Sequence, residues 1–318
     1  MIRHFGVLIP STNTTVEMEY TRLLPPTLQV HVGRLGKGDN TPFSPSRPDD
    51  IAYQARLLGT AQVEVVCLIQ TSASLSADEY DTTTTRQMTA GAGVPSLTSA
   101  QAIGQAVCAL GARRIALVSP YSQAVLDRAR QYFESRYGVD VVAMEGFGAT
   151  DSYAISTISA DHATAALTRV DRPAIEALVV PGGNFSTMRF IAAWEQQFQK
   201  PVVSTNQAAL WAMMGVMQMA SLCWAWGGCS HRCRAYRPTV CLSHDASRVL
   251  PYQELLTRIR CGEGAYSHFS GSASSRVRCE VAICFTRFHR PACRTSARAI
   301  GPRHWHDTSK GLALASAG

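Results

Sequence analysis

The stretch FGVLIPSTNTT at residues 5–15 decides the fold class of this 318-residue chain. A short apolar run ends at Pro10, and small hydroxyl and amide side chains follow it at once. This order is typical of a buried strand that leads into a helix, because Ser, Thr and Asn cap the first turn of helices. The stretch therefore predicts an α/β protein.

Similar apolar runs recur over the first two thirds of the chain, in alternation with segments of helical character. The predicted strands are Phe5–Ile9, Val63–Ile69, Arg114–Val118, Val139–Met144 and Ala177–Val180. The predicted helices Ser99–Leu110 and Gln123–Tyr137 are followed by Gly111 and Gly138, at positions where glycine ends helices. The alternation predicts parallel sheets that are covered by helices on both faces.

Small polar residues follow four of these predicted strands. The four loops are PSTNTT at 10–15, QTSAS at 70–74, SPYS at 119–122 and PGGNFST at 181–187. Ligands bind beyond the carboxyl ends of strands in open parallel sheets, and helix starts there leave N–H groups that hold an anion. The loops therefore predict a carboxylate site, with simple helix capping as the alternative interpretation.

Four segments, taken in order, resemble motifs of the aspartate/glutamate racemase superfamily, in the branch that holds maleate isomerases and arylmalonate decarboxylases. They are VLIPSTNTTVE at 7–17, QTSAS at 70–74, RRIALVSPY at 113–121 and PVVSTNQA at 201–208. The resemblance covers roughly residues 4–214. It implies two similar parallel-sheet α/β halves with the active site between them. The first half is expected at 1–118, with 206–218 packing back on it, and the second at 119–205.

The cysteines of the family indicate its reactions. The resemblance implies one cysteine in each half, and racemases use the pair to move a proton across the substrate. In maleate isomerases the first cysteine adds to the double bond, and arylmalonate decarboxylases keep only the second, as a proton donor. In this chain Gln70 occupies the first position and Gly182, by alignment, the second. Cys67 and Cys108 are expected to be core residues.

The loops and the resemblance together predict the site residues. The expected catalytic positions are Gln70, Tyr121 and Gly182. The expected substrate-binding residues are Ser11, Thr12, Asn13, Thr71, Ser72, Asp151, Gly183 and Asn184. Asn13 is expected to hold one carboxylate, and Thr71 with Ser72 a second carboxylate or an enediolate. No metal and no cofactor are expected.

The predicted function is a maleate isomerase-like cis–trans isomerisation of a small dicarboxylate. A cofactor-independent malonate-type decarboxylase or an amino-acid racemase relative is one alternative. A non-catalytic dicarboxylate-binding protein or a defective enzyme copy is another, since both usual cysteines are absent. The expected partner is a small dicarboxylate, with no nucleic acid and no membrane, and a homodimer is left open. The low cysteine content of residues 1–218 indicates a reducing cytoplasm.

The last hundred residues differ in composition from the rest. Residues 1–218 carry 16 Lys and Arg against 18 Asp and Glu, whereas residues 219–318 carry 14 against 5, with eight of the ten cysteines. This indicates a low-order tail rich in Cys, Arg and Ser, as translation in another reading frame would give. The net positive charge of the chain therefore comes from this tail, and it does not indicate a folded basic surface that binds nucleic acid.

Two alternatives concern the same end of the chain. A metal module would use Cys229, His231, Cys233, Cys241 and His244, but only one close cysteine pair has zinc-site spacing. A membrane span would cover Ala208–Trp226, which is nearly uncharged. Its start resembles that of a soluble helix, and Gln218 and Ser221 interrupt it, so a span is not expected.

Overall fold

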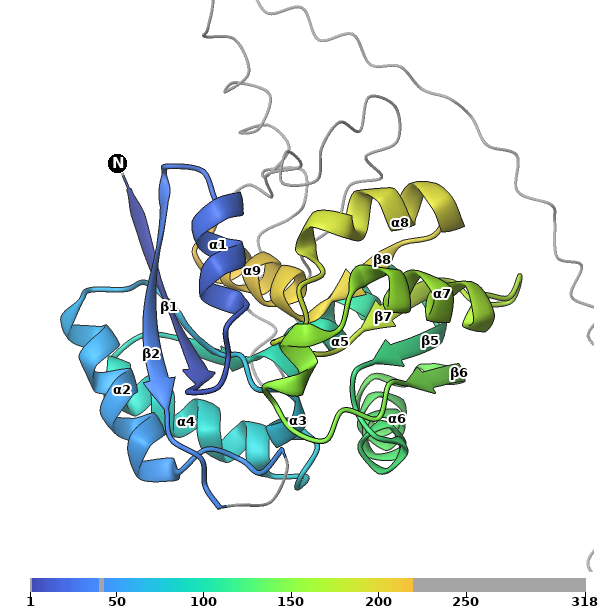
Figure 1. The fold of residues 1–318 in the computed structure, drawn as a ribbon. Helices are drawn as coiled ribbons and strands as arrows, with labels where there is room; N and C mark the ends of the chain where they lie inside the picture. The colour runs from blue at the N-terminus through green and yellow to red at the C-terminus, as the bar shows by residue number, and fades with distance from the viewer. Residues whose placement is uncertain (1, 40–42, 220–318) are drawn as a thin grey trace, which may run out of the picture. The chain divides into compact units, whose positions relative to one another are not determined.

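Two parallel sheets organise the part of the chain that the structure describes. The computed structural model describes residues 2–39 and 43–219, all within one compact unit. The first sheet has the strand order β2-β1-β3-β4 and the second β6-β5-β7-β8. All neighbouring strands in both sheets are parallel. The predicted α/β fold of two similar halves is confirmed (Figure 1).

The strands are short and the helices connect them in regular alternation. The strands are β1 (Arg3–Pro10), β2 (Leu28–Leu35), β3 (Val66–Leu68), β4 (Ser96–Thr98), β5 (Arg114–Ser119), β6 (Asp140–Gly146), β7 (Ala177–Val180) and β8 (Val202–Ser204). The helices are α1 (Val16–Leu23), α2 (Pro48–Thr60), α3 (Thr71–Ser74), α4 (Tyr80–Ala92), α5 (Ser99–Ala109), α6 (Gln123–Tyr137), α7 (Ala160–Val170), α8 (Ile191–Phe198) and α9 (Thr205–Val216). Two 3₁₀ turns complete the set, η1 (Ala154–Thr157) and η2 (Met188–Phe190).

The five predicted strands correspond to β1, β3, β5, β6 and β7, and the two predicted helices to α5 and α6. Gly138 ends α6 with a backbone φ of 60°, as its position indicated. The strand β2 was not predicted, because its sequence LQVHVGRL mixes polar and apolar residues. That mixture fits its place at the edge of the sheet, where burial is incomplete.

The boundary between the halves lies earlier than the sequence suggested. The first half was expected to end at residue 118, but β5 pairs with β6 and β7 in the second sheet. The connection between α5 and β5 therefore separates the two sheets. The apolar run of β5 alone carries no sign of which sheet it joins, so its partners could not be read from its residues.

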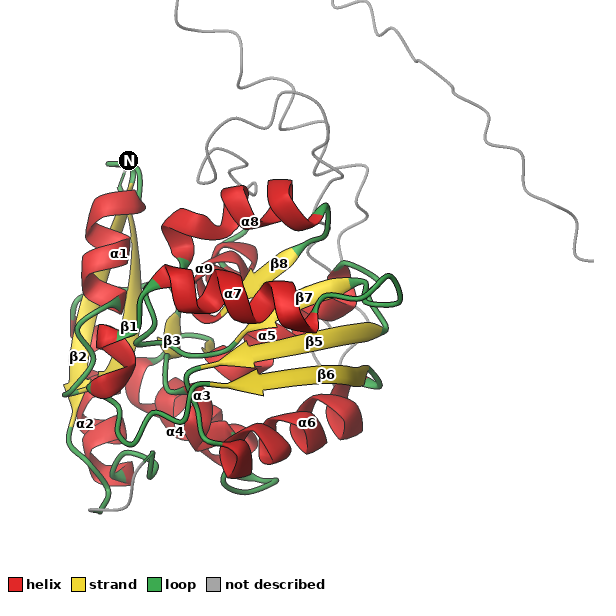
Figure 2. Ribbon diagram, turned by 45° about the vertical axis from the view of Figure 1, so that its right-hand side comes forward, coloured by secondary structure: helices red, strands yellow, loops and turns green. Residues whose placement is uncertain are grey.

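Each sheet has helices on both faces. In the first half, α2 and α4 lie side by side, and their apolar residues form one core cluster with Leu8, Leu35 and Leu68 of the sheet. The other face of the first sheet contributes Val7, Cys67 and neighbouring residues to a larger apolar cluster, which continues into α5, α9 and the second half. In the second half, α7 and α8 lie on one face and α6 on the other (Figure 2).

A buried carboxylate joins the halves below the carboxyl ends of the strands. Asp81 of α4 is 1% exposed and accepts hydrogen bonds from the Thr98 hydroxyl, at 2.9 Å, and from the Tyr132 phenol of α6, at 2.5 Å. A buried carboxylate needs such partners to offset the loss of its hydration. Asp81 therefore fixes α6 of the second half against the first.

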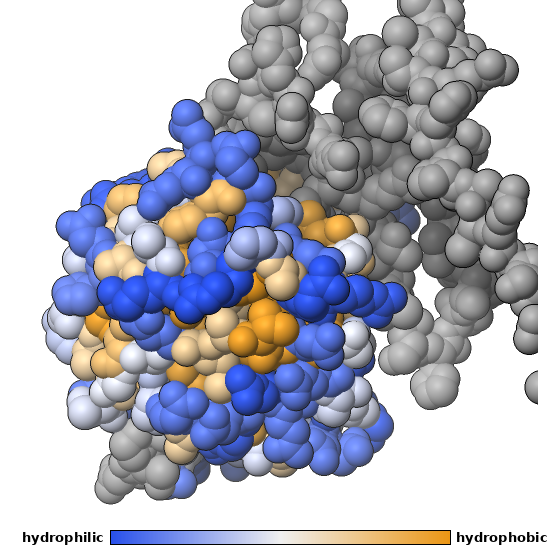
Figure 3. Space-filling model, turned by 90° about the vertical axis from the view of Figure 1, so that its right-hand side faces the viewer, coloured by the Kyte–Doolittle hydropathy of each residue, from blue (hydrophilic) through white to orange (hydrophobic). Residues whose placement is uncertain are grey.

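The surface of the described part mixes polar and apolar residues, and on the face in Figure 3 small apolar patches are bordered by polar residues. Within residues 2–39 and 43–219, no helix has the length and apolarity needed to cross a membrane. The helix α9 at the start of the considered span has 12 residues. Apart from Met219, the predicted tail at 219–318 and its considered metal module lie outside the described residues.

Candidate active site

A small cavity lies where loops from both halves meet. It is lined by the loops that follow β1, β2, β3, β5, β6 and β7, all at the carboxyl ends of parallel strands. The cavity volume is about 30 Å³. Eight of the predicted site residues line it: Thr12, Asn13, Gln70, Thr71, Ser72, Tyr121, Gly183 and Asn184. Sequence reasoning did not single out the other lining residues, which are Pro10, Phe43, Ile69, Ser152 and Ile155.

Three predicted residues do not line the cavity. Ser11 is exposed beside it. Asp151 is also exposed, and its carboxylate accepts the N–H groups of Tyr153 (2.7 Å) and Ala154 (2.9 Å), so it caps its own turn. Gly182 is buried behind the lining, where its N–H donates to Thr205 Oγ1 at 2.7 Å. The contacts of Asp151 and Gly182 turn both away from a ligand in the cavity.

Gly182 also has no room for a side chain. Its φ is 147°, a conformation that L-residues rarely adopt, and an added Cβ would lie 2.9 Å from Cγ of Pro120. The neighbouring Gly183 is equally confined, because a Cβ there would lie 2.8 Å from Ile69 Cγ2 of the first half. Glycine at these positions lets the two halves approach each other at the cavity.

Asn13 presents a free donor to the cavity. The residue is 3% exposed, and its Oδ1 accepts the N–H groups of Thr15 and Val16, both at 3.0 Å, at the start of α1. This pairing fixes the amide so that Nδ2 is the atom left over. Among the residues that the structure describes, Nδ2 has no hydrogen-bond partner, and Asn13 lines the cavity.

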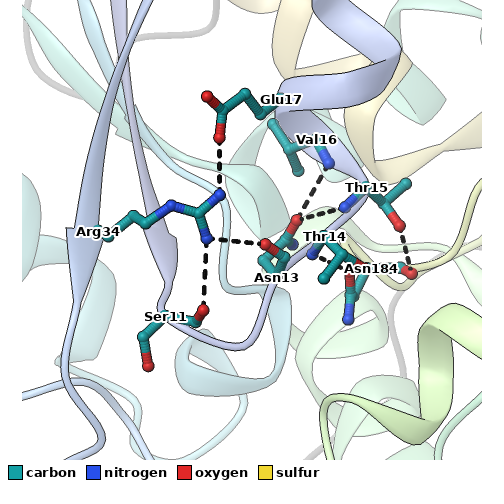
Figure 4. Close-up of polar contacts among 8 residues, drawn as sticks. All are labelled: Ser11, Asn13, Thr14, Thr15, Val16, Glu17, Arg34 and Asn184. Atoms are coloured by element: carbon teal, nitrogen blue, oxygen red, sulfur yellow. Dashed lines mark hydrogen bonds and ion pairs between the residues drawn. The ribbon is translucent and has the colours of Figure 1, made fainter.

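Arg34 of β2 holds the loop that carries Asn13 (Figure 4). Its guanidinium donates to the carbonyl oxygens of Ser11 at 3.3 Å and Asn13 at 3.0 Å, and it pairs with Glu17 at 2.7 Å. A planar guanidinium satisfies several oxygens in one fixed arrangement. Sequence reasoning missed Arg34 because it lies on the strand that was not predicted.

Asn184, an asparagine like Asn13, joins the two halves through its side chain. Its Nδ2 donates to the carbonyl oxygens of Ser152 (2.6 Å) and Thr12 (3.3 Å), and its Oδ1 accepts the Thr14 N–H at 2.8 Å. The Thr15 hydroxyl donates to the Asn184 carbonyl at 2.8 Å. Asn184 therefore shapes the cavity wall by binding protein groups.

Hydroxyl groups form the opposite wall. Thr71 is 1% exposed, and its Oγ1 lies 2.9 Å from Ser99 Oγ and 3.3 Å from Thr205 Oγ1. Burial raises the pKa of the Tyr121 phenol well above its usual value, and contacts with the Ser72 and Thr71 hydroxyls and the Ser72 backbone oppose this only in part. The phenol is therefore neutral near pH 7 and acts as a hydrogen-bond donor.

No thiol lines the cavity among the described residues. Cys67 is fully buried in the core, as expected, and burial raises the pKa of its thiol, which makes the reactive thiolate scarce. Cys108 was expected in the core as well, but it is exposed on α5. Within the described residues there is also no group of three His, Cys, Asp or Glu side chains that could hold a metal ion.

Sequence comparisons match this chain to two curated relatives over most of the length of each relative. The maleate isomerase of Nocardia farcinica is 24% identical over 225 residues, which cover 67% of this chain and 89% of that protein. The maleate isomerase of Pseudomonas putida is 25% identical over 232 residues, which cover 67% of this chain and 91% of that protein.

Solved structures share the fold. The maleate isomerase Iso from Pseudomonas putida S16 superposes with a TM-score of 0.61 at 22% identity, over 69% of this chain and 94% of that one. Unliganded arylmalonate decarboxylase gives a TM-score of 0.55 at 22% identity, over 71% of this chain and 94% of that one. The sequence model of the arylmalonate decarboxylase family matches residues 6–227, which is more than half of the chain, and the protein therefore belongs to this family.

Proposed function

We propose that the protein is an enzyme that binds a small dicarboxylate between its two halves and catalyses its cis–trans isomerisation with a group other than the two family cysteines. The observation that carries the proposal is the cavity itself, whose lining combines Asn13, with its unused Nδ2, and the hydroxyl residues Thr71, Ser72 and Tyr121. Neutral hydrogen-bond donors that are fixed in a largely buried site stabilise carboxylate oxygens. The curated relatives, matched over most of their length, are maleate isomerases.

The residues suggest how a dicarboxylate would be held. One carboxylate would accept from Asn13 Nδ2, and the other from Ser72 and the Tyr121 phenol. The apolar side chains of Ile69 and Ile155 would contact the carbon chain between them. No cofactor enters this proposal.

A second candidate is decarboxylation of a malonate, which needs a proton donor but no group that adds to a double bond. No thiol lines the cavity among the described residues, so the proton donor would have to be another group. In this reaction the bond to one carboxylate breaks, carbon dioxide leaves, and the electron pair remains on the other carboxylate as an enediolate. The Tyr121 phenol would give its proton to the enediolate carbon, and solvent would restore the phenol. Isomerisation, in contrast, needs a group that adds to the double bond.

Proton NMR of the purified protein with maleate, and separately with malonate, tests both candidates. Fumarate formation would support the isomerase, and acetate formation with loss of carbon dioxide would support the decarboxylase. Tyr121→Phe should slow decarboxylation strongly if the phenol is the proton donor. Thermal stabilisation by both ligands without any product would instead support the non-catalytic binding protein.

A further inference from the structure

Gln70 lines the cavity, but both polar ends of its side chain bind backbone. Oε1 accepts the N–H of Ser46 at 3.1 Å, and Nε2 donates to the carbonyl of Ser44 at 2.9 Å. The amide thus pairs with this segment as a neighbouring strand would. An amide does not titrate near neutral pH, and these two bonds occupy it, so the expected catalytic role has no support in its contacts.

The segment that Gln70 holds carries Phe43 into the cavity lining. The Phe43 ring meets the Tyr121 ring edge to face, with centroids 5.4 Å apart and planes at 71°. The backbone φ of Phe43 is 63°, in the left-handed region that residues other than glycine rarely adopt. Such a conformation persists only when surrounding contacts hold it.

We propose that Gln70 is a specificity-determining residue that limits the ligand to small, unsubstituted dicarboxylates. It holds Ser44 and Ser46, which keeps Phe43 against Tyr121. The aromatic ring then fills the space where a bulky substituent on the ligand would lie. This inference rests on the proposed dicarboxylate function, and it assigns Gln70 a positioning role instead of a chemical one.

Gln70→Met tests the proposal, because methionine has a similar length and removes both hydrogen bonds. The isolated bridge between Lys37 and Ser46 remains, so the segment should loosen without unfolding. Gln87→Met is the matched control. Gln87 donates to the carbonyl of Pro48 at 2.9 Å, in the same part of the chain, and it does not line the cavity.

The first measurement is hydrogen exchange of the Ser46 amide in the ligand-free proteins. Its N–H donates directly to Gln70, so exchange should quicken by roughly tenfold in Gln70→Met and stay unchanged in Gln87→Met. Equal exchange in the wild type and in Gln70→Met would overturn the holding role.

The second measurement is calorimetric affinity for malonate and for phenylmalonate. Gln70→Met should gain about tenfold in phenylmalonate affinity relative to malonate, whereas Gln87→Met should match the wild type. Faster Ser46 exchange with an unchanged affinity ratio would overturn the role in specificity. If neither the wild type nor a variant binds malonate, phenylmalonate or maleate, the proposed function fails and the specificity role with it, whereas the exchange data still decide the holding role.

Discussion

Each half contributes one asparagine to the cavity, and the two differ in what they leave available. Asn13 follows β1 and uses only its amide oxygen within the protein, whereas Asn184 follows β7 and uses both ends of its amide. The same side chain therefore leaves a donor available in one half and joins the two halves in the other. The lesson is that a polar residue in a site loop must be judged by its unused atoms.

The largest expected effect is on stability, in Asn184→Ala. The substitution leaves the Thr14 N–H and the carbonyls of Ser152 and Thr12 without their partner, and we expect a loss of about 3 kcal/mol in the free energy of unfolding. Urea denaturation measures it. The control Gln123→Ala removes an exposed contact with Asp127 and should cost under about 0.5 kcal/mol. Equal losses in the two variants would contradict the assembly role.

The next effect is on binding, in Asn13→Asp. Aspartate retains the acceptor for the N–H groups of Thr15 and Val16, so unfolding should change by less than about 1 kcal/mol. It lacks the donor, so calorimetric affinity for maleate should fall by about 100-fold. Asn13→Ser keeps a capping oxygen without adding charge, and its affinity should fall as well. An unchanged affinity in both variants would remove Asn13 from the site.

A pH effect should appear at Glu19 of α1, whose carboxylate binds the segment that follows Asn184 and the start of α9. It is 2% exposed and accepts from the Met188 N–H at 3.0 Å, the Ser186 hydroxyl at 3.1 Å and Asn206 Nδ2 at 2.7 Å. Burial raises the pKa of this carboxyl, and these hydrogen bonds oppose the effect only in part.

Because the folded-state pKa is above the unfolded one, the contribution of Glu19 to stability is full below the unfolded pKa. It is lost as the pH rises through the folded pKa. Between the unfolded-state and the folded-state pKa of Glu19, the wild type should therefore lose stability relative to Glu19→Gln as the pH rises. The loss should be at most about 1.4 kcal/mol per pH unit. Denaturation curves of both proteins across the interval measure this. A constant difference between them would show that Glu19 does not titrate there.

The smallest expected effect concerns Arg34, which binds the Asn13 loop and does not itself line the cavity. Arg34→Met removes the tethers on the Ser11 and Asn13 carbonyls, and maleate affinity should fall by about threefold. Arg22→Met, at an exposed arginine of α1, should leave the affinity unchanged. A loss as large as that of Asn13→Asp would mean that Arg34 contacts the ligand itself.

The sequence predicted the elements whose signal is local. The apolar runs of β1 and β7 and the small polar residues after them were sufficient to place the site at the carboxyl ends of the strands. The partners of each polar side chain in the site could not be predicted, because they are backbone groups far away in the sequence. Gln70 binds Ser44 and Ser46, and Asn184 binds Thr12, through contacts that no residue type encodes. Phe43 was missed for the same reason, since its place in the lining depends on a tertiary contact with Tyr121.

The confinement of Gly182 has an evolutionary consequence. A side chain there meets the Pro120 ring and requires a different backbone conformation, so a thiol cannot appear at this position by one tolerated codon change. Replacement of Pro120 would relieve the contact but leave the strained backbone conformation, so a side chain at this position requires more than one further change. A lineage that carries this pair of residues would be held away from cysteine chemistry at position 182, and selection would act on the remaining hydroxyl and amide groups.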